Sequence, residues 1–161
     1  HKISKKEQAQ QYAMATKAIL GKNLMHAIKT KGTAGALEFC NTRAIPLTDS
    51  MAKAQGVSIS RVSDKPRNPN NEAKGHLAEQ LARYNTSLNA GENLEPGIVS
   101  IGSKAYYTIP IMTNGMCLQC HGTEQINTET RAKLNALYPT DKATGYDVDQ
   151  LRGMWVVEGI E

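Results

Sequence analysis

Apolar residues recur at helical spacing along the first part of the chain. Between Ser4 and Lys31 they form a broad stripe, while lysines and glutamines fill the opposite face. The stripe consists of Ala9, Tyr12, Ala13, Ile19, Leu20, Leu24, Ala27 and Ile28. Thr16 interrupts it with a hydroxyl, and Gly32 is a typical helix stop. We expect one long helix here, which either covers the domain, packs on a partner chain or continues toward a membrane anchor.

Shorter helices and four strands are predicted further along the chain. Apolar spacing, with flanking glycines and prolines, predicts helices over residues 34–41, 46–55, 72–89 and 128–138. Short apolar or alternating runs predict strands over residues 57–62, 98–101, 105–112 and 154–157. Gly102 and Ser103 join the second and third of these strands tightly, which is typical of a hairpin.

This order of elements predicts an α+β fold with a mostly antiparallel sheet. Strands that follow one another pair as hairpins, and we expect the helices to cluster on one side of the sheet. A length of 161 residues suits a single domain of ordinary size. Within it we separate the N-terminal helix, residues 1–32, from the remaining domain, residues 33–161.

The strongest chemical signal is the run Cys117-Leu118-Gln119-Cys120-His121. It has the C-x-x-C-H spacing of a c-type haem attachment site. Two thiols separated by two residues can bond to the two vinyl groups of one porphyrin, and the following histidine then becomes an axial ligand of the iron. The spacing predicts one covalently bound haem c, held by Cys117, Cys120 and His121.

Two other interpretations of these cysteines require different surroundings. A redox disulfide between Cys117 and Cys120 would have the motif open a helix within a βαβ unit, and a strand-like run does precede it. A zinc site needs two further ligands at short spacing. The remaining cysteine and histidines all lie far away in the sequence, at Cys40, His1, His26 and His76.

Composition excludes several functional classes. The net charge of +4 is moderate, and no basic run is dense enough to indicate binding of nucleic acid. No acid–base pair or nucleophile stands out, so we do not expect an enzyme. With one Phe and one Trp, the core has few aromatic rings, and a porphyrin would supply a large apolar plate.

The predicted cofactor also indicates a compartment. Haem c is attached outside the cytoplasmic membrane, so we expect a periplasmic protein in oxidising surroundings. No apolar run approaches the ~20 residues of a membrane span. The first residues lack the apolar segment of a signal peptide, so we expect a mature or trimmed form whose signal or anchor is absent from this chain.

The second axial ligand of the iron is a separate question. Cys40, His76, His26 and the methionines are the possible donors, although Met116 is too close to the attachment site to reach the other haem face. Cys40 follows Phe39 in an apolar helical stretch, and a free thiol in an oxidising compartment needs a reason. A bound thiolate would favour ferric iron and lower its reduction potential. A buried cysteine that merely packs is the competing interpretation.

Four segments together resemble one family, the Tll-like PAS-type c-haem domains, and the resemblance covers most of the chain. The haem motif belongs to the third segment. The segments are residues 36–46 (ALEFCN, then IP), 61–71 (RVSDKPRNPNN), 106–122 (YYTIPI leading into CLQCHG) and 145–153 (GY through LRG). After the second segment the chain departs from the family, because Glu72-Ala73-Lys74 stands where many members have a proline and a tryptophan.

The resemblance implies a PAS-like sheet with helices packed over it and haem c held against it. It implies a six-coordinate iron with the motif histidine, His121, on one side and a cysteine, matching Cys40, on the other. It also implies that Arg61, Arg67 and Asn68 lie near the haem, where they could pair with its propionates through charge-assisted hydrogen bonds.

Two functions follow as hypotheses. In the first, the protein is a redox or gas sensor, in which NO or CO, or reduction, displaces the thiolate and the long N-terminal helix transmits the change. In the second, it is a periplasmic electron-transfer cytochrome that keeps both ligands. The expected partners are a diatomic gas or a redox protein, and a second copy could pack through the N-terminal helix.

Overall fold

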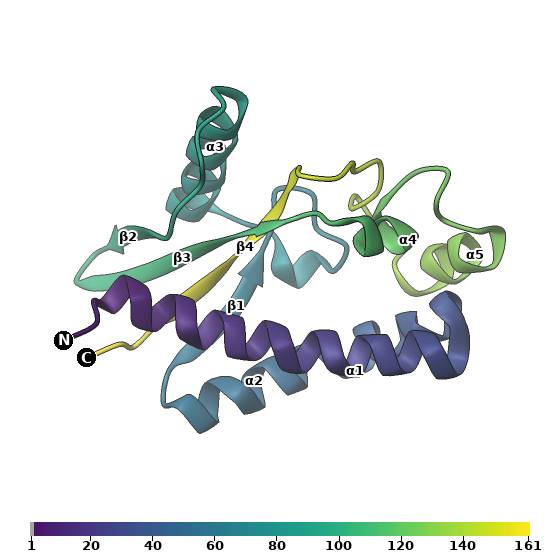
Figure 1. Ribbon diagram of the computed structural model, residues 1–161, viewed down its shortest axis with the longest axis horizontal. Coiled ribbons are helices and arrows are strands. Elements are labelled where there is room, and N and C mark those ends of the chain that lie inside the picture. The colour runs from purple at the N-terminus through teal and green to yellow at the C-terminus, as the bar shows by residue number, and fades with distance from the viewer. Residues whose placement is uncertain (1) are drawn as a thin grey trace.

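A four-stranded antiparallel sheet forms the centre of the molecule. The structure is a computed structural model that describes residues 2–161. The strands are β1 (Ser58–Val62), β2 (Gly97–Ile101), β3 (Lys104–Met112) and β4 (Leu151–Glu158). Their order in the sheet is β1-β4-β3-β2, so the last strand of the chain lies between the first and the third (Figure 1). The expected α+β fold with an antiparallel sheet is confirmed.

The helices cover both faces of the sheet. They are α1 (Lys5–Thr42), α2 (Ala44–Gln55), α3 (Gly75–Asn89), α4 (Leu118–His121) and α5 (Thr128–Leu137), with the short turns η1 (Pro69–Asn71) and η2 (Gly115–Cys117). In Figure 1, α1 and α2 lie below the sheet and α3 stands above it. The expectation that the helices would cluster on one side is therefore wrong.

The central strand β4 explains this two-sided arrangement. Trp155 and Val157 pack into the cluster that includes Ala9 and Ala13 of α1. Met154 and Val156, which alternate with them, pack with Leu81 of α3. Because neighbouring side chains of a strand point to opposite faces, an uninterrupted apolar run needs cover on both.

The long helix α1 consists of two segments that meet at Gly32. Ser4 caps its start, where the Ser4 hydroxyl and Glu7 form a capping box. Gly32 has φ 72°, a left-handed conformation that divides residues 5–31 from residues 33–42. The predicted stop is present as a kink at Gly32, while the division into residues 1–32 and 33–161 stays a prediction. His1 lies outside the described residues.

The first segment of α1 packs along the sheet, and its small side chains bring it close. Ala9, Ala13 and Leu20 are buried there. The buried Thr16 hydroxyl donates to the Tyr12 carbonyl at 2.9 Å, so the polar interruption of the stripe is satisfied within the helix. Packing of a second copy on the outer face of this segment stays a prediction.

Two element boundaries differ by three residues from those expected, and the others differ by at most two. The helix α3 begins at Gly75 instead of residue 72, because Ala73 N donates to the Ser63 carbonyl and keeps the preceding residues extended beside β1. The strand β4 begins at Leu151, which pairs with Met112 across an irregularity in β3. Within residues 2–161, no helix combines the length and the apolar character that a membrane crossing requires.

Candidate haem-attachment site

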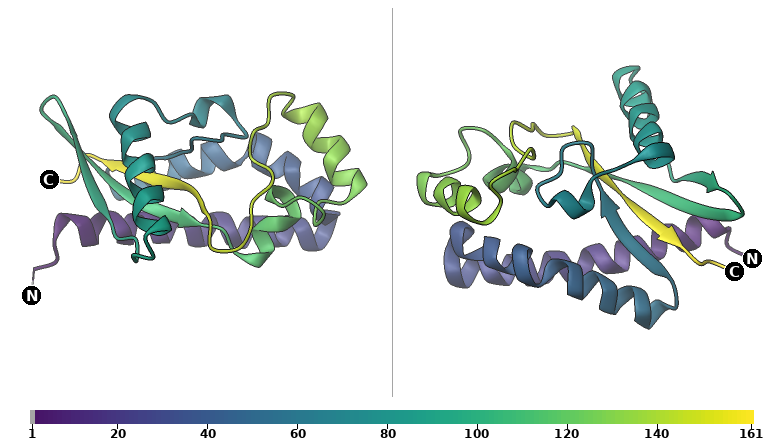
Figure 2. Two further views of the ribbon diagram at one scale, coloured as in Figure 1. Left: turned by 90° about the horizontal axis from the view of Figure 1, so that it is seen from above. Right: turned by 180° about the vertical axis from the view of Figure 1, so that it is seen from behind.

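The C-x-x-C-H motif forms a tight turn directly after β3. Asn114 begins the turn, since its side-chain oxygen accepts from Cys117 N at 3.1 Å and lies 3.2 Å from Cys117 Sγ. The single helical turn α4 then ends at Gly122, whose N–H donates to the Leu118 carbonyl at 2.9 Å. A Cβ at position 122 would lie 2.6 Å from that oxygen, so only glycine fits after the histidine. In both views of Figure 2 this turn and α5 lie at one end of the molecule.

The imidazole of His121 is fixed in one tautomer. Its Nδ1 lies 2.7 Å from the Ala143 carbonyl oxygen. A carbonyl can only accept, so Nδ1 carries the proton and Nε2 keeps its lone pair. Burial lowers the pKa of His121 well below its usual value, and nearby Arg152 and Arg67 lower it further. A neutral imidazole with a free Nε2 is the form that binds a metal ion.

The segment before β4 holds the motif in place. Gly145 N donates to the Gly122 carbonyl and Tyr146 N to the His121 carbonyl, both at 2.9 Å. The Tyr146 ring meets the His121 ring edge-on, with 6.3 Å between centroids. Sequence reasoning missed this role because nothing in the spacing of residues 140–150 indicates which distant turn they contact.

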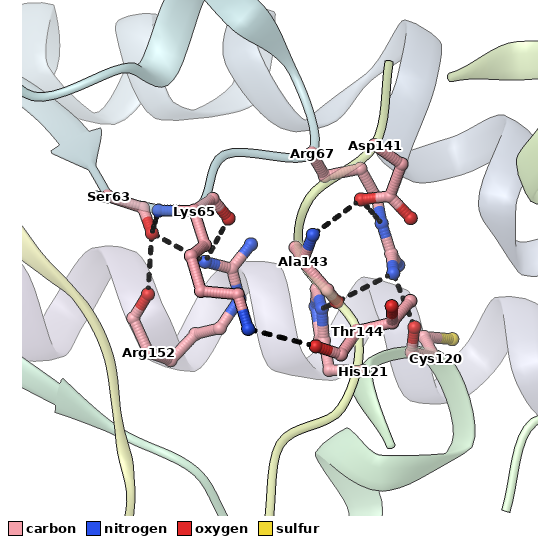
Figure 3. A network of polar contacts seen from close by, with 9 residues as sticks. All are labelled: Ser63, Lys65, Arg67, Cys120, His121, Asp141, Ala143, Thr144 and Arg152. Carbon is pink, nitrogen blue, oxygen red and sulfur yellow. Dashed lines mark hydrogen bonds and ion pairs between the residues drawn. The ribbon is translucent and has the colours of Figure 1, made fainter. Parts of the chain in front are cut away.

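Arg67 joins three parts of this site (Figure 3). Its Nε lies 3.2 Å from Asp141 Oδ1. Its Nη2 donates to the Ala143 carbonyl at 3.0 Å and also to the Cys120 carbonyl. Asp141 Oδ1 accepts in turn from Ala143 N at 2.9 Å. The arginine thus ties the loop before η1 to the attachment turn and to the segment that supports His121.

A second group of cations surrounds Tyr146. Lys65 Nζ lies 4.6 Å from the ring centroid, and the Arg152 guanidinium lies 5.4 Å from it. The Ser63 hydroxyl accepts from Arg152 Nη1 at 2.9 Å, and Lys65 Nζ donates to the Thr144 carbonyl at 3.1 Å. These cation–π contacts hold the ring that packs on His121.

Cys40 lies in the second segment of α1, close to Cys120. A charge on Cys40 raises the pKa of Cys120. Burial raises the pKa of Cys120 to about 11 and also raises that of Cys40, while the guanidinium groups of Arg61 and Arg67 oppose the shift at Cys40. Cys120 packs against the cluster that contains Leu37, one turn before Cys40.

Arg61 and Asn68, the other residues predicted to meet the propionates, have different surroundings. The Arg61 guanidinium lies 5.4 Å from the centroid of Trp155, and burial lowers its pKa. Among residues 2–161 the guanidinium has no hydrogen bond or ion pair, so a partly buried cation lacks an anion. The Asn68 side chain accepts from Asn70 N at 3.0 Å and caps η1.

The structure brings Cys40, Arg61, Arg67, Cys120 and His121 into one region, since the charges of Arg61 and Arg67 act on the pKa of Cys40 and of His121, and those of Arg67 and Cys40 act on the pKa of Cys120. Two other possible donors lie elsewhere. His76 is exposed on α3, where its Nδ1 lies 3.2 Å from Glu79, and His26 is exposed on the first segment of α1.

The competing interpretations of the motif lack their structural setting. All three cysteines are free thiols. The strand before the motif belongs to an antiparallel sheet, and the helix after it is a single turn, so no βαβ unit surrounds the cysteines. No group of three or more His, Cys, Asp or Glu side chains within residues 2–161 is arranged to hold a metal ion. Within residues 2–161 the motif therefore has neither the βαβ setting nor the metal-ligand group that those interpretations require.

Comparison with known proteins gives one family. The family model described as Tll0287-like, for the protein Tll0287, matches residues 2–158. Among solved structures, the crystal structure of the cyanobacterial heme-protein Tll0287 matches with a TM-score of 0.61 and 24% sequence identity, over 93% of this chain and 94% of that chain. At this identity the structural match concerns the fold. No curated protein matches the chain.

Proposed function

This chain belongs to the Tll0287-like family, and from that premise we propose that it is a c-type haem protein acting as a redox or gas sensor. The observation that carries the proposal is the fixed tautomer of His121 within a C-x-x-C-H turn whose two thiols are free. The solved relative is a heme-protein by its title, which supports the same cofactor here.

Cys117 and Cys120 would attach the haem through thioether bonds, in which each S–H adds across one vinyl group. His121 presents Nε2 as one axial ligand, because Nδ1–H is held by Ala143. When bound, the haem would supply an iron that exchanges one electron and that binds a diatomic gas once one of its ligands is released. Arg61, a partly buried cation without an anion within residues 2–161, suits a propionate or the Cys40 thiolate.

Cys40 is the proposed second axial ligand. Within residues 2–161 its Sγ has no hydrogen bond to another residue, and a hydrogen bond with its own backbone lowers its pKa. Arg61 and Arg67 favour the thiolate electrostatically, and this partly offsets the burial that disfavours it. A thiolate donor would hold the iron in the ferric state at a low reduction potential.

The position of Cys40 on α1 supports a sensing role. The residue lies only eight positions after the kink at Gly32, and the first segment of the same helix runs along the sheet. Thr33 Oγ1 also lies 3.2 Å from Gln119 Oε1 of the attachment turn. Release of Cys40 by NO, by CO or on reduction would free residues 33–42 to move, and the kink gives them a hinge.

An electron-transfer cytochrome is the second candidate. The attachment turn lies at the surface, where Asn114, Gly115 and Met116 are exposed. A redox partner protein could therefore approach the cofactor closely at this turn. In this alternative, both axial ligands remain bound in both oxidation states. Either function would place the protein in the periplasm, and neither needs a catalytic residue.

Absorption spectra of the ferric and ferrous protein, with and without NO and CO, test these proposals. A sensor is expected to show a ferric thiolate-ligated spectrum and a new gas-bound spectrum after reduction. If no gas binds in either oxidation state, the gas-sensing proposal is wrong and electron transfer is favoured. A pyridine haemochrome assay that detects no c-type haem would contradict the cofactor itself.

A further inference from the structure

The carbonyl group of Ala143 is shared by two donors. His121 Nδ1–H reaches it at 2.7 Å and Arg67 Nη2 at 3.0 Å, and the Arg67 contact is buried. A carbonyl oxygen has two lone pairs, so it accepts both bonds at once. The orientation of the imidazole therefore depends on an oxygen whose position a charged side chain fixes.

Arg67 is itself held rigidly. Its Nε faces Asp141 Oδ1 at 3.2 Å, and that same oxygen accepts from Ala143 N at 2.9 Å. Arg67, Asp141 and the backbone of Ala143 thus close a ring of hydrogen bonds, shown in Figure 3. Both partners of the ion pair are nearly buried, with side chains 9% and 11% exposed. A buried, charge-assisted ring of this kind is costly to open.

We propose that Arg67 is a positioning residue for the iron ligand, which fixes the Ala143 carbonyl and the Cys120 backbone so that His121 presents Nε2. This inference rests on the proposed haem function. It gives Arg67 a task different from the propionate pairing expected from the sequence, because Nε and Nη2 are both engaged with the protein. Only Nη1 has no hydrogen bond within residues 2–161.

The task requires the guanidinium fork and not only its charge. The fork reaches Asp141 with one nitrogen and two backbone carbonyls with another. A lysine ammonium is a point charge that cannot reproduce this planar set of contacts. Arg67→Lys therefore keeps the positive charge but loses the contacts that fix the Ala143 carbonyl. Asp141→Asn weakens the hydrogen-bonded ring and leaves the Arg67 side chain in place.

The test measures hydrogen exchange at His121 Nδ1 in the haem-loaded protein, by NMR with isotope-labelled histidine in deuterated water. The variants are Arg67→Lys, Arg67→Gln and Asp141→Asn. Arg83→Gln is the matched control, because Arg83 lies on α3 and donates only to Gln80. We expect exchange about tenfold faster in the three test variants, the effect of losing one buried hydrogen bond, and no change in the control.

The outcomes separate the two proposals. If the native protein carries haem but exchange in Arg67→Lys and Asp141→Asn equals that of the native chain, Arg67 does not position His121. If Arg67→Lys matches the native chain and only Arg67→Gln differs, Arg67 acts through its charge and the inference is wrong. If the native protein holds no covalent haem, the proposed function fails and this inference fails with it. If Arg67→Gln does not fold, Arg67→Lys and Asp141→Asn still show whether Arg67 positions His121.

Discussion

The two proposed iron ligands are held in opposite ways. His121 lies in a network in which its own Nδ1, its carbonyl and its ring are all engaged, by Ala143 and Tyr146. Cys40 is held by burial and by the helix that carries it, and within residues 2–161 its Sγ has no hydrogen bond to another residue. Of the two proposed ligands, His121 is therefore the more constrained and Cys40 is the one that can be released. A ligand-exchange sensor needs this asymmetry.

The largest effect is expected when His121, the constrained ligand, is replaced. His121→Ala removes a buried ligand whose orientation the fold specifies, so binding of the iron on that side should weaken on the order of a hundredfold or more, beyond the loss typical of an outer-shell contact. Haem content and the low-spin ferric spectrum would measure it. His76→Ala, an exposed histidine on α3, is the control. An unaltered spectrum in His121→Ala would show that His121 is not the constrained ligand of the iron.

The next largest effect is expected when Cys40, the releasable ligand, is replaced. Cys40→Ser should keep covalent haem, because Cys117 and Cys120 remain, but lose the thiolate signature. Its reduction potential should rise by on the order of 0.1 V, a fraction of the roughly 0.8 V that axial ligands span. Potentiometry with spectral detection measures this shift. A potential and ferric spectrum equal to those of the native chain would leave Cys40 as a buried packing residue.

A smaller effect is expected for the cation beside Cys40. Arg61→Gln removes a guanidinium that favours the thiolate, so the share of ferric protein with Cys40 bound should fall by on the order of tenfold, equivalent to about 1.4 kcal/mol. Competition with added imidazole, followed by absorbance, measures this share. Arg43→Gln makes the same charge change at an exposed position after α1. Equal affinities for imidazole in both variants would mean that Arg61 does not act on Cys40.

The smallest effect concerns the kink before Cys40. At Gly32, φ is 72° and a Cβ added there would meet no atom within 4 Å, so Gly32→Ala introduces backbone strain without a clash. The cost of about 1 kcal/mol should lower Tm by roughly 2–4 °C. Gly21→Ala, at a helical glycine with the same open space, should raise Tm instead. If both variants shift Tm in the same direction, the kink does not depend on the left-handed conformation.

The sequence by itself determined the local features of this protein. Helical spacing predicted the first segment of α1, Gly32 predicted its end, and alternation with a tight turn predicted the hairpin of β2 and β3. The four family segments predicted membership in the Tll-like family, which the match over residues 2–158 confirms. Such features depend on neighbours within a few residues, and these are visible in a linear pattern.

Only the tertiary structure decided what surrounds the motif and which faces are covered. Nothing in the spacing could pair Arg67 with Ala143 or place Tyr146 against His121, because these contacts join residues far apart in sequence. The apolar run of β4 was visible, but the need for α3 on its second face follows from its central place between β1 and β3. Long-range partners are chosen by packing of the whole chain, and so the sequence identified the C-x-x-C-H motif while the fold decided how its histidine is held.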